Sequence, residues 1–128
     1  MQQPLPKAAP FNLPQAFAQA LALHQKGRLG EAEALYAQVL AARPDHIDAL
    51  QMMGLVKLAK GRPAEALNLI TAAMKARAPS PQLLLNHGLV LNALARHDEA
   101  LESFDRAIRQ KSKYAEAHNN RGAASTCA

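Results

Sequence analysis

Aromatic residues are scarce in this chain: they make up 4% of its 128 residues, and tryptophan is absent. The apolar residues, 49% of the chain, are mostly Ala and Leu. Ala and Leu favour helices, whereas aromatic and β-branched residues favour strands. The composition therefore predicts an all-α protein, and the length suits one domain with a modest core.

Cysteine is almost absent too. Cys127 is the single cysteine, so no disulfide can form within the chain, and a reducing compartment suits it. No apolar run reaches about 18 residues, and the first residues, MQQPLPKAAPFNLP, lack the continuous apolar segment of a secretory signal. We therefore expect a cytoplasmic protein that does not span a membrane.

Groupings of residues that carry chemistry are missing as well. The five histidines form no HExxH motif, the glycines form no phosphate-binding loop, and no base accompanies Cys127. The neighbouring carboxylates Asp98 and Glu99 lie where a helix is predicted to begin, and the helix dipole explains them there. We therefore expect no catalytic residue, no metal and no cofactor, and so no enzyme activity.

The net charge of +5 is concentrated in residues 47–80. That segment holds two acidic residues and five basic ones, which are Lys57, Lys60, Arg62, Lys75 and Arg77. Proteins that bind single-stranded nucleic acid add aromatic side chains on which bases stack, and none lies in this segment. A solvated polar face is the favoured interpretation, and nucleic-acid binding is a remote alternative.

What the sequence does contain is a repeat with a period of 34 residues. Small residues recur at this spacing in three series, which are Ala20, Gly54, Gly88 and Gly122; Ala32, Ala66 and Ala100; and Ala73 and Ala107. Large apolar residues recur in the same way, as Tyr36, Ile70 and Phe104. The repeat divides the chain into a Pro-rich arm (1–12), three units (13–46, 47–80 and 81–114) and a partial unit (115–128).

Each complete unit is predicted to be a hairpin of two helices. Its apolar residues recur at spacings of three and four, and the pattern is interrupted once, in the second unit by KGRP. There Gly61 ends one helix and Pro63 opens the next. The small residues allow the two helices to approach closely, and Tyr36, Ile70 and Phe104 fill the space beside that contact.

A helical hairpin with small, small, large and small residues in this order resembles the tetratricopeptide repeat, whose signature is W-x2-L-G-x2-Y, then A-x3-F, then P. The third unit matches through Gly88, Ala100, Phe104 and Ala107. The second matches through Gly54, Ala66 and Ala73, with Ile70 in place of the aromatic residue. The chain departs from the signature in having no Trp and in having Ser112 where a closing Pro is usual. The resemblance implies a right-handed α-solenoid of three units plus one terminal helix, about seven helices in all.

In this family the first helices of successive units line a concave face. The resemblance therefore implies a partner-binding groove formed by Phe17, Leu21, Gln51, Met52, Leu55, Gln82, Leu85, Asn86, Leu89, Asn119 and Asn120. A wall of apolar and amide side chains suits an extended peptide or an amphipathic helix. The pattern leaves open whether Leu55 and Leu89 face this groove or the core between units. We expect a scaffold for protein–protein interaction, with a protein or peptide as its partner.

Two variants of the family give more specific expectations. Some members hold the acidic C-terminus of heat-shock chaperones with Lys, Arg and Asn along the first helices. Of the matching positions here only Asn86 fits, so that partner is not expected. Asn86 and Asn120 are similar to the asparagine ladder of O-GlcNAc transferases, in which amides bond a peptide backbone. The alternative function is therefore the substrate-recruiting region of a larger enzyme, an O-GlcNAc transferase-like glycosyltransferase.

The two ends of the chain carry separate expectations. The arm, residues 1–12, is either a flexible lead-in or an extended segment that occupies a groove through Leu5 and Phe11. Residues 115–128 are the first helix of a fourth unit or a capping helix. Gly122 favours a fragment of a longer array, because glycine is useful in a helix only where a second helix approaches. A helix with an uncovered side also predicts self-association through this end.

Overall fold

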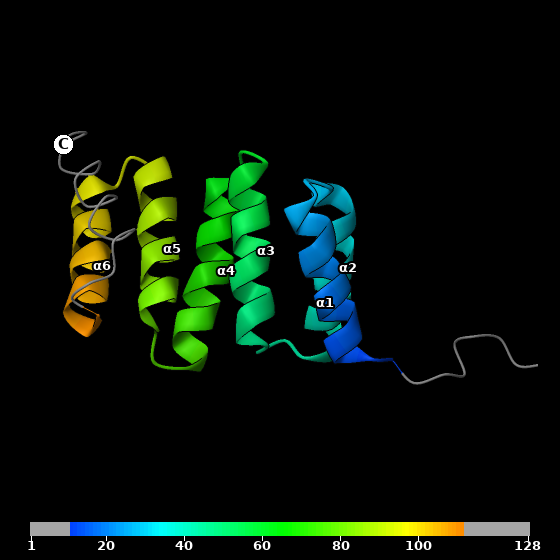
Figure 1. Ribbon diagram of the computed structural model, residues 1–128. Helices are drawn as coiled ribbons and strands as arrows, with labels where there is room; N and C mark the ends of the chain where they lie inside the picture. The colour runs from blue at the N-terminus through cyan, green and yellow to red at the C-terminus, as the bar shows by residue number, and fades with distance from the viewer. Residues whose placement is uncertain (1–10, 112–128) are drawn as a thin grey trace, which may run out of the picture.

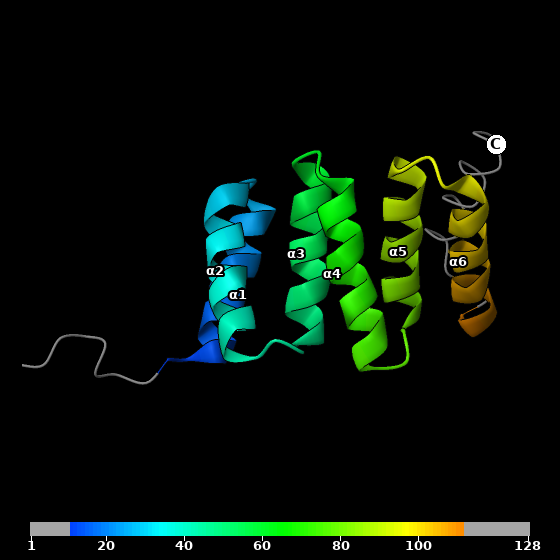
Figure 2. The ribbon, with the colours of Figure 1, turned by 180° about the vertical axis from the view of Figure 1, so that it is seen from behind.

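The computed structural model describes residues 11–111 and contains six α-helices within them (Figure 1). They are α1 (Leu13–Gln25), α2 (Leu29–Ala42), α3 (Ile47–Ala59), α4 (Pro63–Ala76), α5 (Pro81–Ala93) and α6 (His97–Gln110). Consecutive helices pair into three hairpins, which stand side by side in a row (Figures 1 and 2). The predicted all-α solenoid of three two-helix units is confirmed. The predicted seventh helix, in residues 115–128, lies outside the described residues.

The first and second helices of the hairpins begin in different ways. Each first helix is capped by a side chain that accepts a hydrogen bond from the backbone N–H three residues on. These caps are Asn12, His46 and Ser80, at 3.0, 3.0 and 3.1 Å. Each second helix instead follows an arginine that pairs with a glutamate in the first turn; Arg28 pairs with Glu31, Arg62 with Glu65 and Arg96 with Glu99.

The turn inside each hairpin passes through left-handed backbone at the same repeat position. Gly27 and Gly61 occupy it with φ of 81° and 78°. Ala95 occupies it in the third hairpin with φ of 62°. Left-handed backbone costs a residue with a Cβ atom about 1–2 kcal/mol. The third turn is therefore strained relative to the other two.

Helices of one hairpin approach closely where the repeat places glycine. A Cβ atom added to Gly54 would lie 2.8 Å from Cδ1 of Ile70, and one added to Gly88 would lie 2.6 Å from Cδ1 of Phe104. Both distances are far below van der Waals contact, so the large side chains occupy the space that a Cβ atom would need. Ile70 and Phe104 are fully buried there.

The alanines of the repeat are buried where helices meet. In the second hairpin the backbone oxygen of Ala66 would lie 3.5 Å from a Cβ atom added to Gly54, so the backbone of α4 approaches α3 at this point. A side chain no larger than a methyl group allows that approach. The fully buried alanines at the repeat positions are Ala20, Ala32, Ala66, Ala73, Ala100 and Ala107.

The row of hairpins is curved. Among the six described helices, α1 contacts α3 and α3 contacts α5, whereas no second helix contacts another second helix. The first helices are therefore closer together than the second helices. It follows that α1, α3 and α5 line the inner side of the curve and α2, α4 and α6 lie outside.

The side of α1 that faces away from the other hairpins carries two glutamines. Gln15 and Gln19 lie on it with Ala22, and all three are exposed. The equivalent residues of α3, one period later, pack against the first hairpin and are buried; they are Ala49, Met53 and Val56. The same helix face is thus suited to water in the first unit and to a neighbouring hairpin in the second.

Candidate functional site

The first helices, which line the inner side of the curve, carry one leucine per hairpin at the same repeat position. These leucines are Leu21, Leu55 and Leu89, and each is half-buried. Leu89 also packs against the buried core of the third hairpin. Leucines that are half-buried in the free protein leave apolar surface that a ligand can cover. We call these residues the inner leucine row.

Two other predicted groove residues lie between hairpins. The ring of Phe17 is 5.9 Å from the ring of Tyr36 and 5.1 Å from that of His46 at the start of α3. Met52 packs against the apolar cluster that contains Tyr36. Phe17 and Met52 are both half-buried and contribute to the contact between the first two hairpins. Sequence periodicity did not distinguish these positions from the inner leucine row.

The predicted amides of the groove differ in burial. Gln82 is exposed, whereas Gln51 and Asn86 are 8% and 2% exposed; Leu85, beside Asn86, is also buried. The side chain of Gln82 donates a hydrogen bond from Nε2 to Oδ1 of Asn86 at 3.1 Å. Nδ2 of Asn86 is buried and has no hydrogen-bond partner among the described residues. An unsatisfied buried donor costs about 1–3 kcal/mol, and an acceptor that reached this buried N–H group would offset that cost.

Several predicted site residues fall outside the part of the chain that the structure describes. They are Asn119 and Asn120, together with Gly122 and the segment predicted to associate with a second copy. Of the N-terminal arm, the structure describes Phe11 and Asn12. Phe11 is 48% exposed and lines a shallow hollow with the first residues of α1.

A charged network joins the first two hairpins and was not predicted. Glu33 on α2 accepts hydrogen bonds from Nζ of Lys57 and from Nζ of Lys60, each at 2.6 Å. Nζ of Lys57 also lies 3.2 Å from Oε1 of Glu65 on α4. The hydrogen bonds from Lys57 and Lys60 lower the pKa of Glu33 from 4.5 to about 2.

This network changes the interpretation of the basic second unit. Lys57 and Lys60 are paired with Glu33, and Arg62 pairs with Glu65 at 3.8 Å. Lys75 and Arg77 are what remains of the five basic residues considered for nucleic-acid binding. The repeat did contain a sign of this network. The positions of Glu33, Lys57 and Lys60 hold leucines one unit later, namely Leu67, Leu91 and Leu94.

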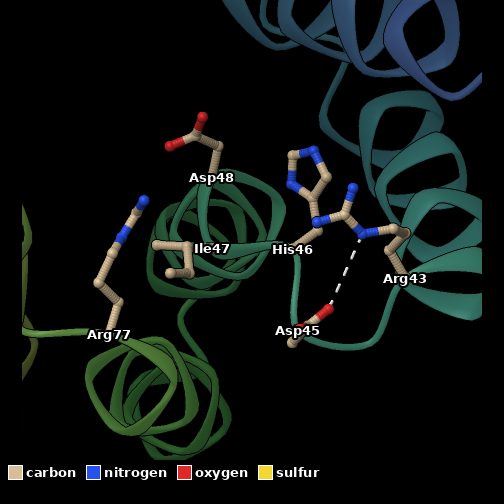
Figure 3. Close-up of a pocket in the computed structure, with 6 residues that line it drawn as sticks. All are labelled: Arg43, Asp45, His46, Ile47, Asp48 and Arg77. Atoms are coloured by element: carbon tan, nitrogen blue, oxygen red, sulfur yellow. Dashed lines mark ion pairs between the residues drawn. The ribbon is translucent and has the colours of Figure 1, made fainter.

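A second unpredicted feature is a hollow at the edge of the first two hairpins. Its walls come from the end of α2, the loop to α3, the start of α3 and the end of α4 (Figure 3). The lining residues are Arg43, Asp45, His46, Ile47, Asp48 and Arg77. Nε of Arg43 is 3.8 Å from Oδ1 of Asp45. Two arginines and two aspartates balance one another here, so the hollow has no overall preference for an anion.

The third hairpin contains a buried serine, Ser103, at the repeat position where the first two hairpins have Leu35 and Leu69. The hydroxyl of Ser103 donates to the carbonyl of Leu84 at 2.8 Å, and Nδ1 of His87 lies 3.1 Å from the same hydroxyl oxygen. Burial lowers the pKa of His87, and Arg106 contributes to the lowering. Ser103 is 3% exposed, so this hydroxyl is closed to a substrate and serves the packing of α5 against α6.

Residues 11–111 contain no helix that is long and apolar enough to cross a membrane. Within the same range no group of three or more His, Cys, Asp or Glu residues is arranged to hold a metal ion.

Comparison with known proteins identifies the repeat. Residues 15–47 and 52–115 match the family model described as the tetratricopeptide repeat. No curated protein matches the sequence significantly.

Solved structures share the fold at low sequence identity. The first tetratricopeptide domain of Spaghetti (RPAP3), bound to the HSP90 peptide SRMEEVD, is 17% identical with a TM-score of 0.84, over 89% of this chain and 90% of that one. YrrB, described as having an unusual peptide-binding site, is 24% identical with a TM-score of 0.80, over 88% of this chain and 58% of YrrB. The O-GlcNAc transferase of Thermobaculum terrenum, a K341M mutant, is 23% identical with a TM-score of 0.85, over 95% of this chain and 23% of that enzyme.

Proposed function

This chain belongs to the tetratricopeptide repeat family, and on that premise we propose that it binds a partner protein. The bound element is an extended peptide or an amphipathic helix, held on the inner surface formed by α1, α3 and α5. The chain captures this element reversibly and carries out no chemistry on it.

The inner leucine row is the observation that carries the proposal. It presents one apolar side chain per hairpin along the concave side, so a ligand lying across the hairpins meets a leucine at each step. Each exposed CH2 group of these leucines that a ligand removes from water contributes about 0.8 kcal/mol to the free energy of binding. The solved structures named above that bind a peptide or have a peptide-binding site support this mode of binding.

Asn86 gives the inner surface a polar contact. Its unpaired Nδ2 group lies one helical turn from Leu89 on α5, so both side chains occupy one stripe of that helix. The exposed Gln82 donates a hydrogen bond to Oδ1 of Asn86 and so orients the amide of Asn86. This arrangement supports recognition of a peptide backbone by an amide, as in the asparagine ladder. It also favours the alternative, a substrate-recruiting region of a larger O-GlcNAc transferase-like enzyme.

The charge of the inner surface selects against one class of peptide. Lys57 is the single Lys or Arg within α1, α3 and α5, and Glu33 and Glu65 neutralise it. A terminal carboxylate on a bound peptide would therefore find no free cation on these helices. We expect neutral or apolar segments to bind in preference to the acidic ends of chaperones.

Selection of ligands from a random peptide library tests the proposal. The binding of the selected peptides is then measured for two variants, each with a matched control. Leu55→Asp should weaken the selected peptides at least about tenfold, because it puts a charge in the apolar contact. Asn68→Asp adds the same charge at an exposed position of α4 on the outer side and should leave binding unchanged. Asn86→Ala should weaken extended peptides, and Asn68→Ala is its control.

The outcomes separate the parts of the proposal. If the library yields no ligand for the folded protein, peptide binding is wrong. If ligands are found but Leu55→Asp and Asn68→Asp bind them equally, the inner surface is the wrong site. The natural reading frame decides the alternative, which requires a glycosyltransferase domain encoded together with these repeats.

A further inference from the structure

The ends of α4 and α6 form an exposed basic edge. It consists of Lys75 and Arg77 in the second unit and of Arg109 and Lys111 in the third. The two pairs occupy the same repeat positions, 34 residues apart, and all four residues are exposed.

A hydrogen bond places the two pairs next to each other. Gln110, between Arg109 and Lys111, donates from Nε2 to the carbonyl of Pro79 at 3.2 Å. Pro79 follows Arg77 by two residues in the loop from α4 to α5. The end of α6 is therefore held against the loop that follows Arg77, so the two pairs lie on the same edge of the row of hairpins.

None of the cations of the basic edge lies within ion-pair distance of a carboxylate among the described residues, although Arg77 also lines the hollow that contains Asp45 and Asp48. At the turns inside the hairpins, Arg28, Arg62 and Arg96 each pair with a glutamate. None of the four residues of the basic edge takes part in an ion pair within residues 11–111. Four neighbouring like charges repel one another, and an anionic partner relieves that repulsion.

Helix dipoles do not account for the whole cluster. Lys75 and Arg109 lie in the last turns of α4 and α6, where a cation stabilises the end of a helix, whereas Arg77 and Lys111 follow the last residue of each helix. The equivalent helix of the first hairpin forms with fewer cations at its end. The end of α2 carries Arg43, which pairs with Asp45 (Figure 3), and no other Lys or Arg. The second and third units each carry two unpaired cations at this place. The excess therefore calls for a ligand rather than a structural role.

We infer that the basic edge binds an acidic segment of a polypeptide. Nucleic acid fits less well, because Phe17, Tyr36 and Phe104 are packed between helices and none of these rings is available for stacking at this edge. An anionic membrane fits less well too: Phe11 is the exposed large apolar side chain of the described residues, and it precedes α1, at the other end of the row. The basic edge and the inner leucine row are different surfaces, so this inference is independent of the proposed function.

The test measures binding of a fluorescein-labelled decaglutamate peptide to the full chain by fluorescence anisotropy at low ionic strength. The edge variant replaces Lys75, Arg77, Arg109 and Lys111 by Gln. The matched control replaces four cations near the hairpin turns by Gln, namely Lys26, Arg28, Arg62 and Arg96, so both variants have the same net charge. Circular dichroism verifies that both are folded.

The edge variant should bind the peptide at least about tenfold more weakly than the unmodified chain, and the control should bind within about twofold of it. Equal losses in the two variants would mean attraction by net charge alone and would overturn the inference. A 20-nucleotide RNA and phosphatidylserine vesicles are tested alongside. If either binds more tightly than the peptide and depends on the same four residues, the assigned class of partner is wrong.

Discussion

The charged network between the first two hairpins gives the sharpest prediction. Glu33, Lys57 and Lys60 hold the positions that Leu67, Leu91 and Leu94 hold one unit later, where the leucines pack in the core. Two interfaces of the same geometry are thus filled by a charged set and by an apolar set. We expect that replacing all three charged residues by leucine maintains the stability of the protein, whereas removing one charge alone lowers it.

The structure sets the size of the effect. A pKa lowered from 4.5 to about 2 corresponds to about 3 kcal/mol at most for Glu33. Its side chain is 23% exposed, so water screens part of this, and a loss of about 1–2 kcal/mol is expected for Glu33→Leu. Lys57, 14% exposed, would then keep only Glu65 as a partner. Replacing all three charged residues by Leu should restore the stability of the unmodified protein or exceed it by about 1–4 kcal/mol.

Urea denaturation followed by circular dichroism measures these free energies of unfolding. Glu31→Leu is the control, because Glu31 forms an exposed pair with Arg28 and should change stability by less than about 1 kcal/mol. The reasoning is refuted if the triple leucine variant is less stable than Glu33→Leu. It is also refuted if Glu33→Leu costs no more than Glu31→Leu.

Three further predictions concern the hairpins themselves. Ala95→Gly should stabilise the protein by about 1 kcal/mol, because glycine adopts the left-handed turn without strain, and a thermal melt measures the gain. Gly88→Ala should destabilise it by about 1–3 kcal/mol through the clash with Phe104, and Phe104→Leu in the same chain should recover part of the loss in urea denaturation. Stability should rise with pH between about 5 and 7, because burial lowers the pKa of His24 and of His87 below the unfolded value and protonation therefore favours the unfolded chain. The stability that the two neutral histidines contribute is complete above the unfolded pKa of 6.5 and is lost as the pH falls through their pKa values in the folded protein. His87→Met, which introduces the residue found at the equivalent position of the second unit (Met53), should reduce the slope of the free energy of unfolding against pH.

Each of these predictions has a distinct contrary result. A gain from Ala93→Gly equal to that from Ala95→Gly would show that strain at the turn is not the cause. Gly30→Ala lies in α2 with nothing within 4 Å of the new Cβ atom and should be stabilising; a loss there as large as for Gly88→Ala would contradict the packing argument. A free energy of unfolding that is flat from pH 5 to pH 7 would remove the histidine argument.

The sequence predicted the helices and their pairing because both depend on periodic, local information. Small residues every 34 positions mark where two helices touch, and the structure has Gly54 against Ile70 and Gly88 against Phe104. The left-handed turns at Gly27 and Gly61 follow from the same repeat. At Ala95 the residue type gives no such signal, and the turn follows from the tertiary structure.

Side chains that act between hairpins were harder to predict. Lys57 and Lys60 are 24 and 27 residues from Glu33, and lysines on a polar stretch are equally consistent with a solvated surface. Phe17 belongs to the predicted groove face, yet its ring turns toward Tyr36 and His46. The direction of this ring depends on the rotamer of Phe17, which neither helical periodicity nor residue type determines. Predicting the candidate site therefore required the positions of neighbouring helices as well as the repeat.

The polar side of α1 has a consequence for how copies of this protein behave when crowded together. A filament grows by stacking one copy on the end of the next, and growth through this side would trap the amides of Gln15 and Gln19 against apolar atoms. Each trapped and unbonded amide group would cost about 1–3 kcal/mol. Association through this side of α1 is therefore disfavoured by two side chains of a single helix, even though the repeat itself extends by adding identical units.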